Sequence, residues 1–364
     1  MKKVFLISPV LENLTNFRRE LILTLVEEGF DVTLLCSFKE EFDEFSKVGV
    51  KYINIDIDRR GTNLKSEFKL LKTYIRILKK EKPDVVLTYT SKCSVYGGMA
   101  CRFLGIPYII NNSGLFDPKR IGHLFGVFLN ILHRMGYSAA SCMMYQNPTE
   151  KAFFQKILWR DVPFRLLPGS GVNLEKFAVM SYPKDGECNF LMICRIQKEK
   201  GIEEYLRAAS VLKSKYNNAN FWILGGFDED YHSQIDELEN NGVLSYYEPV
   251  KDVRPFIEKA HCIVNPSYHE GMSNVLLEAA ASGRPAIASD CPGCNNIVSD
   301  GISGFLAKVA DANNLTAQME RFIQLPQETK QQMGLSGRKI VEDRFDRKIV
   351  INAYLDEIGK IVNK

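Results

Sequence analysis

The chain has 364 residues, too many for one ordinary hydrophobic core and typical of two domains. Its hydrophobic content of 45% and charged content of 25% are those of a soluble globular protein, and no apolar run is long enough to span a membrane. Residues 1–168 hold 25 Lys and Arg against 17 Asp and Glu, whereas residues 169–364 hold 22 against 27. The basic first half indicates contact with an anionic surface, and the first residues read as a strand rather than a signal peptide, so we expect a cytoplasmic protein.

Short apolar strands alternate with amphipathic helices along the first half. A helix is predicted at residues 16–28, which Gly29 ends, and strands are predicted at 3–8, 31–36, 50–57, 85–89, 108–110, 141–146 and 164–167. Because the connections are short, this alternation predicts an α/β fold with a doubly wound parallel sheet. Ligands of such sheets bind at the carboxyl ends of the strands.

Two stretches of the first half are candidate surfaces. Within residues 64–82, one side of a predicted helix carries only cations: Lys65, Lys69, Lys72, Arg76 and Lys79. This stripe is either a solvated face or a contact with anionic lipid. Residues 115–134 are apolar nearly all round, which favours a buried helix over one that dips into a bilayer.

The second half continues the alternation after Gly169 and Gly171, which we interpret as a hinge between domains because the third glycine of a dinucleotide fingerprint is missing. Strands are predicted at 190–194, 221–224, 246–250 and 262–264, and helices at 202–213, 253–260, 274–282, 311–324 and 345–362. We therefore expect one domain at residues 1–168 and a second at 169–344.

Residues 262–289 carry the clearest chemistry. They predict a strand, a loop and a helix from about Asn274, whose exposed amides and positive dipole end form an anion site. Glu270 and Glu278 are eight residues apart, about two helical turns, so both side chains are expected to reach one crevice, where carboxylates accept hydrogen bonds from sugar hydroxyls. Arg195 and Lys200, in the loop after the strand at 190–194, are suited to a diphosphate.

This stretch resembles a known family. Ser267, Glu270-Gly271, Glu278-Ala279 and Gly283-Arg284-Pro285 resemble the E-x7-E signature of glycosyltransferase family 4, and the likeness extends over nearly the whole chain. It implies the GT-B fold, in which two Rossmann-like, doubly wound domains face a central cleft, the first binding the acceptor and the second the donor. It also implies that the last helix, at about 345–364, crosses back to the first domain.

The resemblance implies roles for individual residues. Glu270, Arg195 and Lys200 are the expected catalytic residues. The expected donor-binding residues are Glu278, Gly225, Gly226, Val250, Gly271, Met272, Ser273 and Asn274. The expected acceptor-side residues are Arg18, Lys92, Asn111 and Asn112.

The family implies a retaining, metal-independent glycosyltransferase without a cofactor. Its nearest members are bacterial enzymes that extend lipid-linked sugars for capsule, O-antigen or glycoprotein assembly. The expected donor is a UDP-sugar carrying a hexose or N-acetylhexosamine. The expected acceptor is a saccharide on undecaprenyl diphosphate, and the expected partner is the anionic cytoplasmic face of the inner membrane.

Other interpretations remain open. Asp56-Ile57-Asp58 and Asp228-Glu229-Asp230 match the D-x-D strings of metal-dependent GT-A transferases. A nucleotide-sugar 2-epimerase on the same fold and a non-catalytic nucleotide-sugar or polyanion-binding protein are further alternatives. Cys291 and Cys294 have the spacing of a redox or zinc motif, although a turn that opens a helix after residue 294 is favoured. Nucleic-acid binding is not expected, because no recognisable module interleaves basic and aromatic residues.

Overall fold

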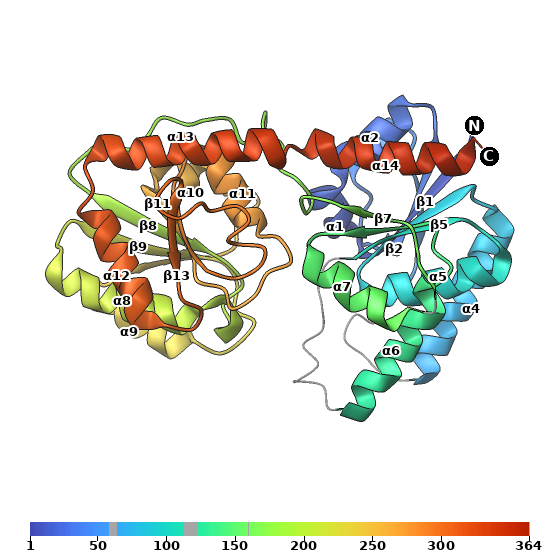
Figure 1. The fold of residues 1–364 in the computed structure, drawn as a ribbon, viewed down its shortest axis with the longest axis horizontal. Helices are drawn as coiled ribbons and strands as arrows, with labels where there is room; N and C mark the ends of the chain where they lie inside the picture. The colour runs from blue at the N-terminus through green and yellow to red at the C-terminus, as the bar shows by residue number, and fades with distance from the viewer. Residues whose placement is uncertain (58–63, 113–122, 159, 364) are drawn as a thin grey trace. The chain divides into compact units, whose positions relative to one another are not determined.

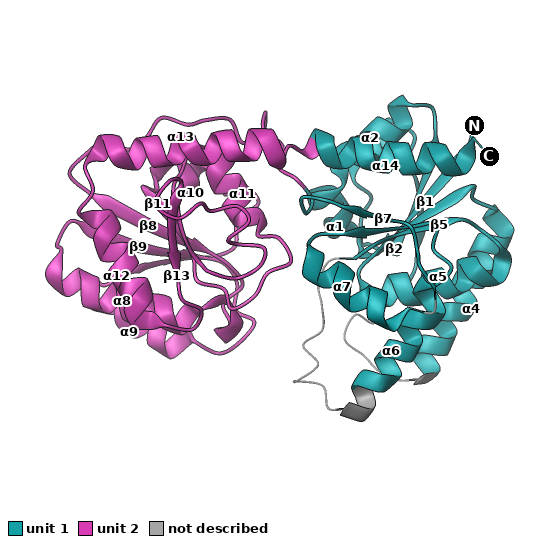
Figure 2. Cartoon of the chain, in the orientation of Figure 1, with its two compact units in different colours: residues 1–170, 348–364 teal, residues 171–347 magenta. Residues whose placement is uncertain are grey.

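The computed structural model describes residues 1–57, 64–112, 123–158 and 160–363. The chain divides into two compact units, unit 1 with residues 1–170 and 348–364 and unit 2 with residues 171–347 (Figure 2). Each unit is a parallel sheet with helices on both faces (Figure 1). The predicted α/β class with two doubly wound parallel sheets is confirmed.

Unit 1 contains a seven-stranded sheet in the order β3-β2-β1-β4-β5-β6-β7, all parallel. Its strands are β1 (Lys3–Val10), β2 (Asp31–Ser37), β3 (Lys51–Asn54), β4 (Val85–Tyr89), β5 (Tyr108–Asn111), β6 (Cys142–Tyr145) and β7 (Phe164–Leu166). The central strand β4 is buried along its whole length, as expected for a strand covered on both faces.

Helices cover both faces of this sheet. They are α1 (Leu11–Phe17), α2 (Arg19–Glu27), α3 (Asp43–Lys47), α4 (Leu64–Glu81), α5 (Ser91–Leu104), α6 (His123–Tyr137), α7 (Pro148–Ile157) and α14 (Arg347–Val362). Side chains that alternate along β1 enter two cores: Val4 and Leu6 pack with α1, α2 and α14, while Phe5 and Ile7 pack with α4, α5 and α6. Two-sided burial therefore holds the sheet in the middle of unit 1.

Unit 2 contains a six-stranded parallel sheet in the order β10-β9-β8-β11-β12-β13. Its strands are β8 (Cys188–Ile193), β9 (Ala219–Leu224), β10 (Ser245–Tyr247), β11 (Cys262–Asn265), β12 (Ala286–Ser289) and β13 (Gly304–Ala307). Its helices are η1 (Lys198–Lys200), α8 (Ile202–Lys215), α9 (His232–Asn240), α10 (Arg254–Lys259), α11 (Asn274–Ala281), α12 (Ala312–Ile323) and α13 (Gln327–Arg344). One core lies between the sheet and α8, α9 and α12, and the other between the sheet and α10, α11 and α13.

Three predictions about helices differ from the structure. The helix expected at 16–28 is two helices, because the backbone at Arg18 leaves the helical region with φ −132° and ψ 8°. Residues 115–122 lie outside the described residues, and the helix α6 that follows is not buried all round: Val127, Phe128, Ile131 and Met135 are 41–46% exposed. The turn at Cys291 opens no helix, because residues 292–297 form only successive turns.

Candidate functional site

The candidate site lies at the carboxyl ends of the strands of unit 2. The strand order reverses at β8: the chain adds β9 and β10 on one side of β8 in the sheet, and then β11, β12 and β13 on the other side. The crevice at such a reversal is where open α/β sheets bind ligands. The loops after β8 and β11 approach closely there: a Cβ on Gly201, which has φ +75°, would lie 2.2 Å from the carbonyl oxygen of Pro266. Only glycine fits at this position.

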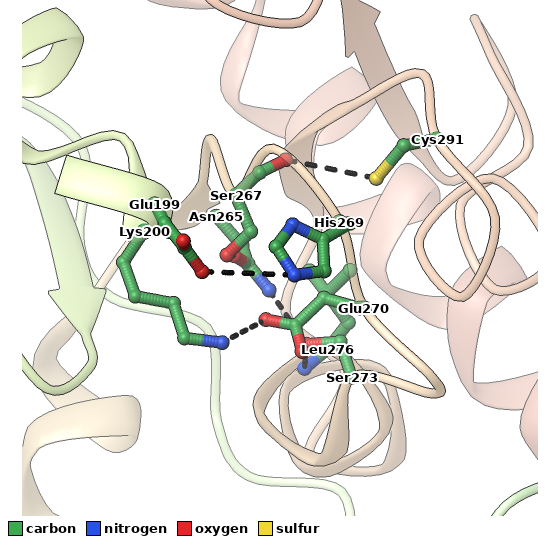
Figure 3. A network of polar contacts seen from close by, with 9 residues as sticks. All are labelled: Glu199, Lys200, Asn265, Ser267, His269, Glu270, Ser273, Leu276 and Cys291. Carbon is green, nitrogen blue, oxygen red and sulfur yellow. Dashed lines mark hydrogen bonds and ion pairs between the residues drawn. The ribbon is translucent and has the colours of Figure 1, made fainter. Parts of the chain in front are cut away.

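An ion pair joins these two loops. The Lys200 ammonium lies 2.7 Å from the Glu270 carboxylate, and the two side chains are only 20% and 18% exposed (Figure 3). Next to it, the His269 imidazole lies 3.6 Å from the Glu199 carboxylate. Since a partly buried ion pair is weakly screened by solvent, the Lys200–Glu270 pair holds the loops together and neutralises both charges.

Hydrogen bonds fix the loop that carries Glu270. The Asn265 amide donates to Ser273 Oγ (2.5 Å), and Ser267 Oγ donates to Asn265 Oδ1 (2.6 Å) (Figure 3). Ser273 caps α11, because its Oγ accepts from the Leu276 amide, and its own amide donates to the Gly293 carbonyl (3.0 Å). Both ends of the loop are therefore tied to buried groups.

The helix α11 offers its first amides to a ligand. The Ser273 amide is occupied by Gly293. Within the described part of the chain, the amides of Asn274 and Val275 have no acceptor, as expected for the first turn of a helix. The side chain of Met272 is buried in the core of unit 2 and so anchors the loop before α11. An anion at this helix end would also meet the positive end of the helix dipole.

Arg195 is the most exposed of the predicted catalytic residues. Its guanidinium, 63% exposed, pairs with the Asp228 carboxylate in the loop after β9 at 2.5 Å. The rest of the predicted D-x-D string is used separately: the Glu229 carboxylate accepts from the Lys198 amide, and Asp230 pairs with His232. These three acids do not converge on one point. In the other string, Asp58 lies outside the described residues.

Glu278 lies one turn into α11 and is half-buried. Burial raises the pKa of its carboxyl to about 7, although the cations of Lys176 and Arg347 oppose the shift. The carboxyl is therefore poised between its neutral and charged forms near neutral pH. A ligand hydroxyl that donates to it favours the charged form.

Gly225 and Gly226, which follow β9, lie close against the backbone at the end of β8. Gly225 has φ +153°, and a Cβ there would lie 1.7 Å from the Cys194 carbonyl oxygen. The Gly226 carbonyl accepts from the Ile196 amide at 2.8 Å. These contacts bring the ends of β8 and β9 together. Val250 is 41% exposed in the loop after β10, where Tyr247 stacks edge-on against Phe256.

The predicted acceptor-side residues lie at the carboxyl ends of the strands of unit 1. Arg18 is buried beside the rings of Tyr89 and Tyr354, which are themselves neighbours with centroids 6.4 Å apart. Asn111 accepts a hydrogen bond from the Tyr354 hydroxyl (2.8 Å), and Asn112 is buried beside it in sequence. Lys92 is paired with the buried Glu67 at 2.7 Å.

The two candidate surfaces of the first half are exposed. On α4, the side chains of Lys65, Lys69, Lys72, Arg76 and Lys79 are all exposed. Phe68 on the same helix is 58% exposed, and the exposed apolar residues of α6 lie two helices away, since α5 packs against both α4 and α6 (Figure 1). Among the described residues, none of the helices combines the length and apolar character that crossing a bilayer requires.

The cysteine pair is buried behind the site. Cys291 donates to the Ser267 carbonyl at 3.6 Å (Figure 3), and a hydrogen bond to Cys294 lowers its pKa. Both cysteines are free thiols. Across the described ranges, no three His, Cys, Asp or Glu side chains are grouped as metal ligands.

Sequence reasoning missed several residues of the site. Asn265 is a polar residue that ends the apolar strand β11, which is the signal that could have identified it. Ser267 belongs to the sequence signature and Asp228 to a D-x-D string, but neither motif indicates their contacts with Asn265 and Arg195. Glu199 and His269 carry no such signal, because their pairing depends on how close the loops after β8 and β11 lie.

Comparisons with known proteins place both halves of the chain. Residues 3–147 match the family described as "Glycosyl transferase 4-like", and residues 187–324 match "Glycosyl transferases group 1". Together the matches cover most of both units.

Similar proteins span nearly the whole chain. An N,N'-diacetylbacillosaminyl-diphospho-undecaprenol alpha-1,3-N-acetylgalactosaminyltransferase of Campylobacter jejuni is 25% identical, over 95% of this chain and 96% of the relative. A UDP-Gal:alpha-D-GlcNAc-diphosphoundecaprenol alpha-1,3-galactosyltransferase of Escherichia coli is 23% identical, over 86% of each chain.

Solved structures share the fold. The sucrose-phosphate synthase of Thermosynechococcus elongatus superposes with a TM-score of 0.80 at 18% identity, over 99% of both chains. HepE of Anabaena, in complex with UDP and glucose, superposes with a TM-score of 0.78 at 15% identity, over 98% of this chain and 99% of that chain. The predicted GT-B fold is confirmed.

The raised pKa of Glu278 predicts a pH-dependent effect of Glu278→Gln on stability. Since the folded protein holds this proton up to about pH 7 and the unfolded chain releases it near 4.5, ionisation of Glu278 makes the native state less stable as pH rises through this window. Glutamine removes the penalty. We expect the free energy of unfolding of Glu278→Gln to exceed that of the parent by ~2–3 kcal/mol at pH 8 and by little at pH 4.

Urea denaturation at both pH values measures this difference. Glu237→Gln, on the exposed side of α9, is the matched control and should change stability little at either pH. A stabilisation by Glu278→Gln of equal size at pH 4 and pH 8 would show that ionisation is not its cause.

Proposed function

Because this chain belongs to the glycosyl transferases, with a 4-like domain in its first half and a group 1 domain in its second, we propose that it transfers a sugar from a nucleotide diphosphate to a lipid-linked saccharide. The observation that carries the proposal is the Lys200–Glu270 ion pair at the strand reversal of unit 2, together with the unused first amides of α11 that follow Glu270 in the chain.

In this proposal the donor diphosphate displaces two internal partners. Lys200 moves from Glu270 to a phosphate oxygen, and Arg195 turns from Asp228 to the same group, where the free amides of Asn274 and Val275 add two hydrogen bonds. As the bond between sugar and phosphate breaks, negative charge grows on the leaving diphosphate. Cations and dipoles already in place stabilise this charge more than they stabilise the bound donor.

The two carboxylates then bind the neutral parts of the donor. Glu270, released from Lys200, accepts hydrogen bonds from the transferred sugar, and Glu278 accepts them from the ribose. Hydrogen bonds from the ribose hydroxyls favour the ionised form of Glu278. Because the pKa of Glu278 is about 7, this carboxyl can release its proton when the nucleotide sugar binds.

The stereochemical course follows from the same arrangement. We propose retention of the anomeric configuration, with the acceptor hydroxyl attacking from the face that the diphosphate leaves. The departing phosphate oxygen takes the proton of that hydroxyl, so no protein base and no metal ion are part of the proposed step.

The relatives suggest which substrates to test. The Escherichia coli relative is named for a UDP-sugar donor, and both relatives are named for saccharides on diphospho-undecaprenol. HepE of Anabaena binds UDP in the same fold. We therefore propose a UDP-hexose or UDP-N-acetylhexosamine donor and an undecaprenyl-diphosphate-linked acceptor, in the assembly of a bacterial surface polysaccharide or glycan.

A panel of donors and acceptors tests this function. Purified protein is incubated with UDP-, GDP- and CDP-sugars and short-chain polyprenyl-diphosphate saccharides, with and without EDTA, and the products are analysed by mass spectrometry and NMR. We expect transfer from a UDP-sugar, an anomeric configuration equal to that of the donor, and full activity in EDTA. An inverted product would reject the mechanism, and epimerised donor without transfer would establish the 2-epimerase alternative.

Removal of Arg195 tests its role on the leaving group. Because Arg195 is exposed and bonded only to Asp228 among the described side chains, Arg195→Ala should fold normally and lower kcat by about 10²- to 10³-fold. Arg254→Ala removes another arginine of unit 2 that is paired with a nearby aspartate, Asp252, and is partly exposed, and it should leave kcat near the parent value. An unchanged kcat/KM for Arg195→Ala would exclude the proposed role.

We also propose that unit 1 binds the cytoplasmic face of the inner membrane through α4 and α6. The exposed cations of α4 would attract anionic headgroups, while Phe68, Phe128 and Ile131 would enter the interfacial region. Each basic residue near an anionic surface contributes about 1 kcal/mol, so the stripe as a whole is sufficient for reversible binding.

Liposome sedimentation tests the membrane contact. Reversing Lys65, Lys69, Lys72, Arg76 and Lys79 to Glu should abolish sedimentation with vesicles that contain anionic lipid, while the parent should sediment with these and not with zwitterionic vesicles. The control reverses five exposed cations of unit 2: Arg207, Lys215, Lys251, Lys259 and Lys339. Equal recovery of the α4 variant and the parent would remove this surface from the proposal.

A further inference from the structure

Arg18 is a buried cation without an acidic partner in the part of the chain that the structure describes. It is 4% exposed, and within that part its side chain makes one hydrogen bond, donated by Nη1 to the Phe17 carbonyl (2.7 Å). Its Nε is buried without a partner, and among the described residues no carboxylate forms an ion pair with it. Leaving a buried charge unpaired costs several kcal/mol, so a partner for this guanidinium is expected.

Another buried arginine among the described residues, Arg284, has the contacts expected of a purely structural role. Arg284, 1% exposed, directs Nε, Nη1 and Nη2 at backbone carbonyls, among them those of Ile257, Ser181 and Glu258 at 2.6–3.0 Å. Burial also lowers the pKa of Arg284 to about 10. The N–H groups of Arg284 are hydrogen-bonded to backbone carbonyls, whereas in Arg18 only Nη1 donates a hydrogen bond within the described part of the chain.

The surroundings of Arg18 hold its guanidinium in place without satisfying it. The ring of Tyr89 lies 5.0 Å from the guanidinium carbon and that of Tyr354 lies 5.9 Å from it, both within the range of cation–π contact. The Tyr89 hydroxyl is itself buried without a hydrogen-bond partner. An unpaired cation and an unpaired hydroxyl thus lie side by side.

This pair of groups lies where unit 1 would bind a ligand. Arg18 is at the break between α1 and α2, after β1, and Tyr89 is the last residue of β4. These two strands are neighbours in the sheet, and their carboxyl ends share one edge with β5. The 14-residue helix α5 begins two residues after Tyr89 with no acidic residue in its first turn, so its positive end lies at the same edge.

We propose that Arg18 and the Tyr89 hydroxyl form an anion subsite that binds a phosphate oxygen of the lipid diphosphate on the acceptor. This inference rests on the proposed function and adds the group by which unit 1 recognises the acceptor. The guanidinium supplies Nε and Nη2 as a fork to one phosphate, the phenol adds a third donor, and Tyr354 brings the last helix of the chain to the subsite. Lys92 is not part of it, because Lys92 is bonded to Glu67.

Acceptor kinetics test the subsite. Arg18→Gln should raise the KM for a short-chain polyprenyl-diphosphate saccharide by about 10- to 100-fold and leave the donor KM unchanged, since a charge-assisted hydrogen bond is lost. For the same saccharide on an uncharged alkyl chain, the variant and the parent should be equal. Arg18→Lys should recover part of the affinity, because it restores the charge without the fork.

A neighbouring arginine is the matched control. Arg19 is already paired with Glu44, so Arg19→Gln should leave the acceptor KM unchanged. A rise in KM of equal size for the charged and uncharged acceptors in Arg18→Gln would show a structural role and overturn the proposal. If Arg18→Gln does not fold, Tyr89→Phe, which removes only the unpaired hydroxyl, should show a smaller shift of the same kind, and its absence would equally overturn it.

Two further measurements complete the test. One distinguishes the diphosphate of the acceptor from the phosphate of membrane lipids, and the other tests the subsite even if the proposed function is wrong. Sedimentation of Arg18→Gln with anionic vesicles should equal that of the parent, and its loss would assign the subsite to membrane phospholipid instead. If the parent transfers no sugar at all, pyrophosphate is titrated by calorimetry into a chain that carries Arg195→Ala and Lys200→Ala. Binding that Arg18→Gln abolishes would support the subsite even then, and equal or absent binding in both chains would reject it.

Discussion

The Lys200–Glu270 ion pair is the contact on which the candidate site depends. It joins the two loops that leave the sheet where the strand order reverses, so each loop defines the position of the other. The approach requires glycine at 201, where the backbone passes against Pro266, and at 293, whose φ of +83° brings it against the carbonyls of Glu270 and Gly271. Glycines with no room for a side chain, a capped helix and a partly buried ion pair thus act together to fix the positions of the two loops.

The two units use the same architecture with different electrostatics. In unit 2, Lys200 and Arg195 lie in the loop after β8 and are paired with Glu270 and Asp228. A ligand must then compete with these partners, which favours a doubly charged diphosphate over a single weak anion. In unit 1, the cations of α4 are exposed, and Arg18 is buried with no acidic partner among the described residues.

The architecture can be predicted from the sequence because strands that are buried on both faces of a sheet are short, continuous apolar runs. The helices between them show the apolar periodicity of amphipathic helices. The sequence also identified the Glu270 to Glu278 segment, where strand, loop and helix are consecutive. It missed α13 because Met333 and Val341 are among its few buried apolar residues, and Gly334 allows α13 to pack against the Gly283 carbonyl where larger side chains would otherwise signal a core face. The break at Arg18 has no glycine or proline, and local propensity carries no sign of it.

Contacts between residues that are far apart in the sequence could not be predicted from it. The sequence predicts that Lys200 and Glu270 bind different parts of a donor, and it cannot show their direct contact, which depends on the packing of β8 beside β11. The expected role of Gly225 at the nucleotide stays a prediction, and the close approach to the Cys194 carbonyl that requires glycine there depends on the packing of β9 beside β8. For α6, periodicity alone cannot distinguish an apolar face that is buried from one that is exposed.

The return of the chain to unit 1 has a consequence for biogenesis. Val350, Tyr354 and Ile358 belong to the same hydrophobic core as β1 and β2, and Tyr354 bonds the end of β5. On the ribosome, the first 170 residues emerge long before this helix, with one face of their sheet still lacking it. The unit made first is therefore finished last, after all of unit 2 has been synthesised, and a nascent chain stalled between the two would present that uncovered apolar surface to chaperones.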